Sequence, residues 1–89
     1  MEKNEIERIY GSKVVALVEV CEKFKEDGES YCFLAFSEEI LTIYMGDQDV
    51  KNVFIAFKED PTEIRVFSTE EPTHKIQNVD QLISNLIGE

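Results

Sequence analysis

Few residues in this chain of 89 could carry out nucleophilic or acid–base chemistry. His74 is the only imidazole, and no serine or cysteine around it stands in a recognisable nucleophile motif. Cys21 and Cys32 are the only cysteines, and their spacing matches neither a CxxC redox pair nor half of a zinc site. We therefore expect an exposed strand histidine and two buried thiols, and we do not expect an enzyme.

Carboxylates occur in pairs along the chain. Asp47 and Asp49 could begin a calcium-binding loop, but the other ligands and the glycine at the sixth position of such a loop are missing. Three further pairs fall at expected turns: Glu38-Glu39, Glu59-Asp60 and Glu70-Glu71. Water solvates both members of a pair at a turn, which leaves no poised acid and base. The glycines never cluster into a phosphate-binding loop, so no metal or cofactor is expected.

The charge balance is strongly acidic, with 19 Asp and Glu against 9 Lys and Arg and a net charge of −10. Such a charge repels nucleic acid phosphates and anionic membranes, so direct binding to either is not expected. No Lys or Arg occurs between Lys25 and Lys51.

The acidic residues would gather if the strands form an up-and-down meander, because alternate loops then lie at the same end of the sheet. One end would collect seven acids: Glu26, Asp27, Glu29, Asp47, Asp49, Glu70 and Glu71. Two interpretations remain open. The acids either keep a small protein soluble, or they steer it to a basic surface on a protein partner.

The ends and the hydropathy of the chain suggest its location. Residues 1–5 carry acids instead of the basic start and apolar stretch of a signal peptide. Glu19 interrupts the longest apolar run, which is far shorter than the roughly 20 residues that span a bilayer. We expect one domain over residues 1–89 in the reducing cytoplasm, without membrane attachment.

A repeated phrase organises the middle of the chain. Phe33-Leu34-Ala35-Phe36 and Phe54-Ile55-Ala56-Phe57 are each followed by acids and then by a second apolar run. We interpret the copies as two related β-hairpins. A turn at Glu38-Glu39 pairs Phe36 with Leu41 in the first hairpin. A loop over residues 59–62 pairs Phe57 with Ile64 in the second.

These pairings divide the sheet side chains between two faces. The aliphatic face is the expected core: Leu34, Phe36, Leu41, Ile43, Ile55, Phe57, Ile64 and Val66. The other face is aromatic: Tyr31, Phe33, Tyr44, Phe54 and Phe67. An apolar face of this size is unusual in water, so either the C-terminal helix covers it or it is an interface with a partner or a second copy.

A helix is predicted near the N-terminus. Asn4 and Glu7 form a capping-box pattern at its start. Apolar residues then recur at intervals of three and four: Ile6, Tyr10, Val14, Leu17, Cys21 and Phe24. The helix should end near residues 25–26, with Gly28 as the stop. A break at Ser12 and a strand over residues 12–20 remain alternatives, because Gly11 interrupts the pattern and the following run is β-branched.

A shorter helix is predicted at the C-terminus. Asn78 with Gln81 is a second capping-box pattern, and an apolar stripe runs from Val79 to Ile87 before Gly88. Residues 73–77 would add a short fifth strand at an edge. The predicted fold is α+β, with an N-terminal helix, a four- to five-stranded antiparallel sheet of two related hairpins, and a short C-terminal helix.

These features favour a small acidic, non-enzymatic protein that inhibits or adapts an intracellular protein partner with a basic surface. Phage-encoded inhibitors and toxin-immunity proteins act in this way, which is an analogy of class. Two alternatives stay open. One is a nucleic-acid mimic that blocks a DNA- or RNA-handling protein with carboxylates in place of phosphates. The other is a homodimeric structural or small-ligand module whose aromatic faces pack together.

Overall fold

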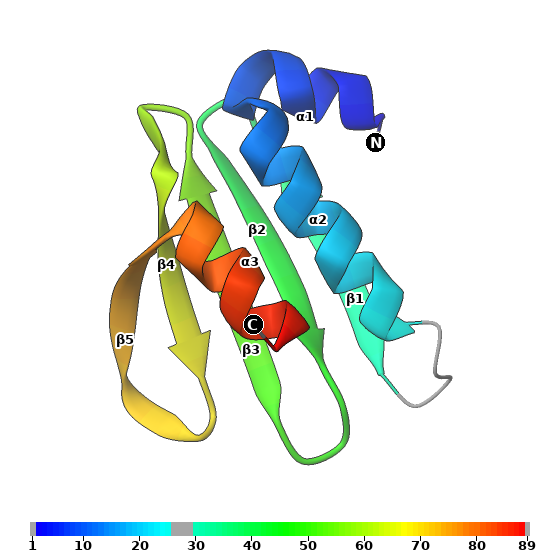
Figure 1. Ribbon diagram of the computed structural model, residues 1–89, viewed down its shortest axis with the longest axis vertical. Coiled ribbons are helices and arrows are strands. Elements are labelled where there is room, and N and C mark those ends of the chain that lie inside the picture. Colours follow the sequence, from blue (N-terminus) through cyan, green and yellow to red (C-terminus); the bar gives the residue numbers. More distant parts are fainter. Residues whose placement is uncertain (1, 26–29, 89) are drawn as a thin grey trace.

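The computed structural model describes residues 2–25 and 30–88, apart from the side chains of residues 72 and 73. Within these residues two helices precede a five-stranded sheet, and a third helix follows it (Figure 1). The elements in chain order are α1 (Lys3–Tyr10), α2 (Ser12–Phe24), β1 (Tyr31–Phe36), β2 (Ile40–Gly46), β3 (Lys51–Phe57), β4 (Asp60–Ser68), β5 (Glu71–Asn78) and α3 (Val79–Ile87). This is the predicted α+β architecture.

The N-terminal helical segment is broken at Gly11. Its backbone has φ 95° and ψ 167°, a combination that is essentially restricted to glycine, and the chain turns there between α1 and α2. The alternative of a strand over residues 12–20 is wrong. Val14, Leu17 and Val18 are fully buried on one side of α2, and this packing outweighs the strand preference of the β-branched valines.

The start of α1 differs from the predicted capping box. The carbonyl of Glu2 accepts bonds from the amides of Glu5 (3.1 Å) and Ile6 (3.4 Å), so the first turn begins at Glu2. Asn4 therefore lies inside the helix, where it cannot cap it, and no side chain caps this end. The predicted stop at Gly28 lies outside the described residues.

Both predicted ends of the C-terminal helix α3 are confirmed. The Asn78 side chain accepts a bond from the Asp80 amide at 2.9 Å, which satisfies a donor that the first turn leaves free. Gly88 follows the helix with φ 83°, in the left-handed conformation that ends many helices.

The sheet is an up-and-down meander in the order β1-β2-β3-β4-β5, with every neighbouring pair antiparallel. The first hairpin has the predicted register, with Phe36 opposite Leu41 and Phe33 opposite Tyr44. The fifth strand, β5, is longer than predicted and lies at one edge.

The second hairpin has a register one residue away from the prediction. Ala56 lies opposite Ile64, where Phe57 was expected, and the ladder is irregular between Ala56 and Phe57. The β3–β4 turn accounts for the shift, because Phe57 pairs with Asp60 across a two-residue turn at Lys58-Glu59 in place of the predicted loop over residues 59–62. The β2–β3 loop aligns β3 with β2: the Asp47 amide donates to the Val50 carbonyl at 2.9 Å, and a Cβ on Gly46 would overlap the Val50 carbonyl oxygen.

A shift of one residue moves a strand's side chains to the opposite faces of the sheet. Phe54, predicted on the aromatic face, is instead buried in the core at 2% exposure. Ile55 and Phe57, predicted in the core, lie on the other face, because they pair with the outward-facing Thr42 and Ile40 of β2.

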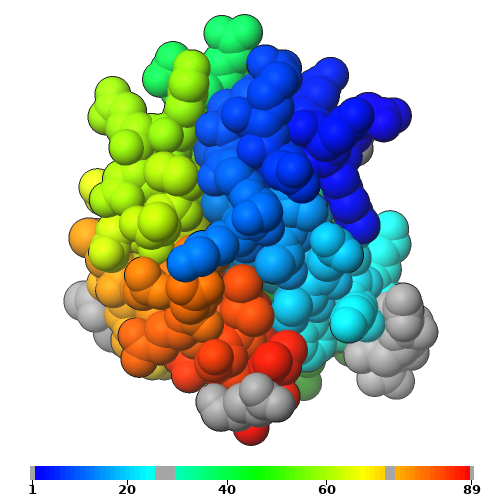
Figure 2. Space-filling model, turned by 45° about the horizontal axis from the view of Figure 1, so that its top comes forward, coloured from blue at the N-terminus to red at the C-terminus, as the bar shows by residue number. Residues whose placement is uncertain are grey.

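All three helices lie on one side of the sheet, as Figure 1 shows for α2 and α3. α3 packs beside α2, and Figure 2 shows their side chains forming one continuous layer. The buried apolar cluster between the helices and the sheet is Ile6, Tyr10, Val14, Val15, Leu17, Val18, Cys21, Cys32, Leu41, Ile43, Met45, Phe54, Ala56, Ile64, Val79 and Leu82. The C-terminal helix thus adds to the cover of the core and leaves the opposite face of the sheet bare.

Candidate binding surface on the uncovered sheet face

The side of the sheet away from the helices is here named the open face. The strand registers place these residues on it: Tyr31, Phe33, Ala35, Ile40, Thr42, Tyr44, Lys51, Val53, Ile55, Phe57, Asp60, Glu63, Arg65, Phe67, His74 and Ile76. None of the described helices covers it. Four of its apolar side chains are strongly exposed: Phe33 (63%), Ile76 (58%), Tyr44 (41%) and Phe67 (39%).

Ring contacts hold several of these side chains against one another. Tyr31 stacks on Phe33 with 5.4 Å between ring centroids, and Phe67 stacks on His74 at 5.1 Å. Four of the five predicted aromatic residues therefore lie on the open face, and only Phe54 does not. His74 is exposed on its strand, as expected.

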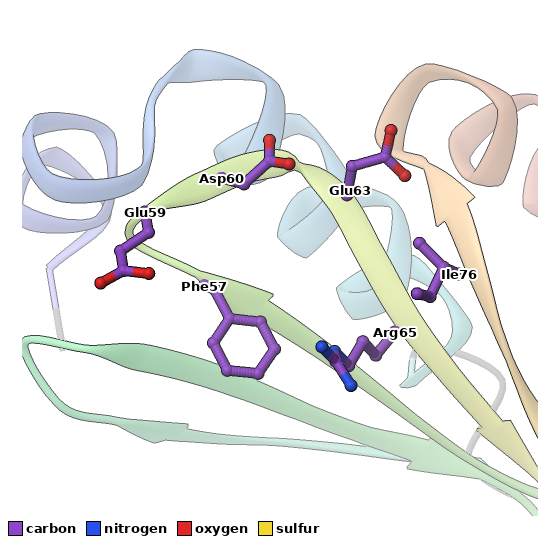
Figure 3. Close-up of a pocket in the computed structure, with 6 residues that line it drawn as sticks. All are labelled: Phe57, Glu59, Asp60, Glu63, Arg65 and Ile76. Atoms are coloured by element: carbon purple, nitrogen blue, oxygen red, sulfur yellow. The ribbon is translucent and has the colours of Figure 1, made fainter.

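A shallow depression of about 590 Å³ lies on the open face beside the β3–β4 turn (Figure 3). Its lining residues are Phe57, Glu59, Asp60, Glu63, Arg65 and Ile76. The Arg65 guanidinium lies 5.0 Å from the Phe57 ring centroid, a cation–π contact. Sequence reasoning missed this site because it placed Phe57 in the core.

The predicted acidic end of the sheet is only partly within the described residues. Asp47 and Asp49 in the β2–β3 loop lie at the same end as Glu70 and Glu71, because the adjacent Thr69 amide donates to the Lys51 carbonyl at 3.0 Å. The other three predicted members, Glu26, Asp27 and Glu29, lie outside the described residues.

Two carboxylates at this end already have structural partners. Asp47 Oδ1 accepts bonds from the amides of Asp49 and Val50, both at 2.8 Å, and so stabilises its own turn. Glu71 forms an exposed ion pair with Lys75 at 2.9 Å. Asp49 and Glu70 are exposed beside them.

The opposite end of the sheet is acidic as well. The β1–β2 and β3–β4 turns meet there, since the Lys58 amide donates to the Glu39 carbonyl at 2.9 Å. The acids of this end are Glu38, Glu39, Glu59, Asp60 and Glu63. The signal was present in the sequence, because successive turns of a meander alternate between its ends, and Glu38, Glu39, Glu59 and Asp60 lie in or next to the first and third turns.

Both cysteine thiols are buried in the core. Burial is the main cause that raises the pKa of Cys21 from 9.0 to about 12, helped by neighbouring Cys32 and Glu22. Burial also raises the pKa of Cys32, and both thiols are free. A thiol that stays protonated at neutral pH is a poor nucleophile and a poor metal ligand.

Within residues 2–25 and 30–88, no three His, Cys, Asp or Glu side chains form a group able to hold a metal ion. None of the helices described has the length and apolar composition needed to span a bilayer. Comparisons of the chain with protein-family models, curated proteins and solved structures give no match.

Proposed function

We propose that this chain is a non-enzymatic binding protein that inhibits or adapts a protein partner, which it holds on the open face. The observation that carries the proposal is the one-sided cover of the sheet. All three helices lie on one face, and the exposed Phe33, Tyr44, Phe67 and Ile76 lie on the other. Exposed apolar residues gathered on one face are typical of interaction sites.

The size of the open face suits a protein partner. Five strands about 4.8 Å apart and about six residues long give an area of roughly 24 by 20 Å. This is most of the roughly 800 Å² that one partner contributes to a standard interface, once side-chain relief is included. The stacked pairs Tyr31–Phe33 and Phe67–His74 lower the conformational entropy that binding would remove.

The charge distribution indicates which partner surface fits. The centre of the open face has one charged side chain, Arg65, while acids stand at both ends of the sheet. An apolar surface with basic residues around it would match both features. The depression lined by Glu59, Asp60 and Glu63 is suited to a Lys or Arg side chain of that partner.

Face-to-face packing of two copies is a second candidate, favoured by the same apolar area. It brings the acidic ends of two chains with a net charge of −10 each near one another, which opposes it at low salt. A nucleic-acid mimic has less support, because the acids at the ends of the sheet form two groups with the apolar open face between them instead of a continuous track.

The test compares two isoleucines of similar exposure. Ile76, 58% exposed on the open face, and Ile87, 52% exposed at the end of α3, are each changed to Thr in the full chain. Wild-type chain on a resin should recover a saturable partner from lysate. Ile76→Thr should weaken that binding by about 10-fold, and Ile87→Thr should leave it unchanged.

Two results would contradict the proposal. One is the absence of any saturable partner at both low and moderate salt. The other is equal loss of binding in the open-face variant and in Ile87→Thr. Light scattering over a range of protein concentrations tests the second candidate, the face-to-face dimer. A chain that remains monomeric at every concentration excludes it.

A further inference from the structure

β1 is an edge strand of the sheet. Among the described residues, no strand pairs with its outer edge. Its six residues contain no charge and no proline, and its six pairs with β2 are regular. An uncharged, regular edge strand is a template for another strand.

The hydrogen-bond pattern shows which backbone groups face outward. The Ser37 amide donates to the Ile40 carbonyl at 3.0 Å, so alternation along the antiparallel ladder directs Ala35 and Phe33 toward β2. The amides and carbonyls of Cys32, Leu34 and Phe36 therefore point away from the sheet. These groups form a row with the spacing that an added strand requires.

The opposite edge of the sheet is protected. β5 carries the Glu71–Lys75 ion pair and Pro72, which lacks an amide hydrogen. Its ladder with β4 is irregular between Val66 and Ser68. Charges, proline and irregular pairing are the features that prevent edge association, and β1 has none of them.

Side chains next to the β1 edge also lack cover. Phe33 is 63% exposed on the open face, while Leu34 and Phe36 are only partly buried on the helix side. An added strand with apolar side chains on both faces would cover all three. This favours an apolar segment as the occupant of the edge.

A second copy of the chain is a poor occupant, because of the helices above β1. α2 lies over β1 near Cys32, and Tyr10 of α1 lies over its other end, with its ring 6.1 Å from that of Phe36. Paired strands are about 4.8 Å apart, whereas packed helices need about 8–10 Å between their axes. The helices of two copies joined at β1 would overlap, but a bare extended segment brings no helices with it.

Acids stand beyond both ends of β1. Glu38 and Glu39 follow it, and Asp47 and Asp49 lie in the loop next to its start, because Tyr31 pairs with Gly46. We propose that the β1 edge binds an extended apolar segment of a protein partner that carries Lys or Arg at both ends, and adds it to the sheet as a sixth strand. This inference rests on the proposed function, since it states how the partner of the open face is held.

The experiment titrates the isotopically labelled full chain with a synthetic peptide of alternating valine and isoleucine, flanked at each end by two lysines. Amide hydrogen exchange is followed by NMR at about 1 mM peptide and low salt. Exchange at Cys32, Leu34 and Phe36 should slow several-fold, while Phe33 and Ala35, already bonded to β2, should not change. A matched peptide with glutamates in place of the lysines should bind at least about 10-fold more weakly.

Three results would overturn the inference. Peptide effects confined to Tyr44, Phe67 and Ile76 would place binding on the open face alone, which leaves the proposed function intact. No effect at any amide would exclude strand addition, and the lysate experiment would still judge the proposed function separately. Slower exchange at the three edge amides with rising protein concentration, together with a dimer mass, would make a second copy the occupant.

Discussion

The two faces of the sheet are built from the same strands and differ chiefly in what lies above them. Ile43 and Tyr44 are neighbours in β2, yet Ile43 is 1% exposed beneath the helices and Tyr44 is 41% exposed on the open face. Both faces are apolar enough to be a core. Helix cover therefore decides which apolar residues stabilise the fold and which remain available to a partner.

The helices cover only one face of the sheet because α2 and α3 pack against each other there. α2 and α3 lie side by side on the same face of the sheet, with α2 against β1 and β4 and α3 against β4 and β5, and α3 begins directly after β5 on that side. With the short α1 joined to α2 at Gly11, no described helix remains for the other face. The open face is left to solvent or to another molecule.

The largest expected effect separates the two faces by stability. Ile43→Ala should lower the free energy of unfolding by about 2–5 kcal/mol, because it removes fully buried methyl groups and leaves a cavity beneath the helices. Urea denaturation followed by circular dichroism measures the change. A loss below about 1 kcal/mol would mean that this face is not a close-packed core.

The pH dependence of stability tests how well the helices exclude water from the covered face of the sheet. Burial raises the pKa of Cys21 from 9.0 to about 12 in the folded chain, so the unfolded chain loses this proton first as pH rises. The contribution is complete below about pH 9 and is lost between pH 9 and 12, by up to about 1.4 kcal/mol per pH unit.

Urea denaturation of the wild type and of Cys21→Ala across this range measures the effect. The slope against pH should be shallower in the variant, and the difference isolates Cys21 from other groups that titrate there. A thiol reagent at pH 8 should not modify the folded wild type. Rapid modification of Cys21, or equal slopes, would show that water reaches the covered face.

The smallest expected effect comes from the open face. Tyr44→Thr keeps a residue suited to strands and removes a ring that is 41% exposed, so the free energy of unfolding should change by no more than about 0.5 kcal/mol. The same urea titration measures it. A loss comparable to that of Ile43→Ala would mean that the open face stabilises the isolated chain, and the contrast between the faces would fail.

The two hairpins show how much of this fold could be predicted from sequence. The first hairpin has a two-residue turn whose flanking Ser37 side chain accepts the Ile40 amide, and its register follows from that turn. In the second, Val53 to Phe57 is apolar at every position, so alternation does not distinguish the two faces. Its register depends on the two-residue turn at Lys58-Glu59 and on an irregularity next to Phe57, while the tight β2–β3 loop sets how β3 aligns with β2.

The residues of the candidate site, like the two hairpins, could be predicted only in part from the sequence. Phe33, Tyr44 and Phe67 were placed on the aromatic face, while Phe54 was misplaced and Phe57 missed, because both depend on the register of β3. The acid pairs of the first and third turns were identified in the sequence. That Glu59, Asp60 and Glu63 line one depression with Arg65 and Ile76 follows only from the pairing of β3, β4 and β5.

The sequence by itself determined the two hairpins, the C-terminal helix with its Asn78 cap, and the acidic turns, because these depend on local spacing and on neighbouring residues. Tertiary structure alone decided the faces of β3, the position of α3 and the exposure of the β1 edge. Each of these depends on contacts between segments distant in the chain. Where both faces of a sheet are apolar, only the packing of the helices selects the one that becomes the core.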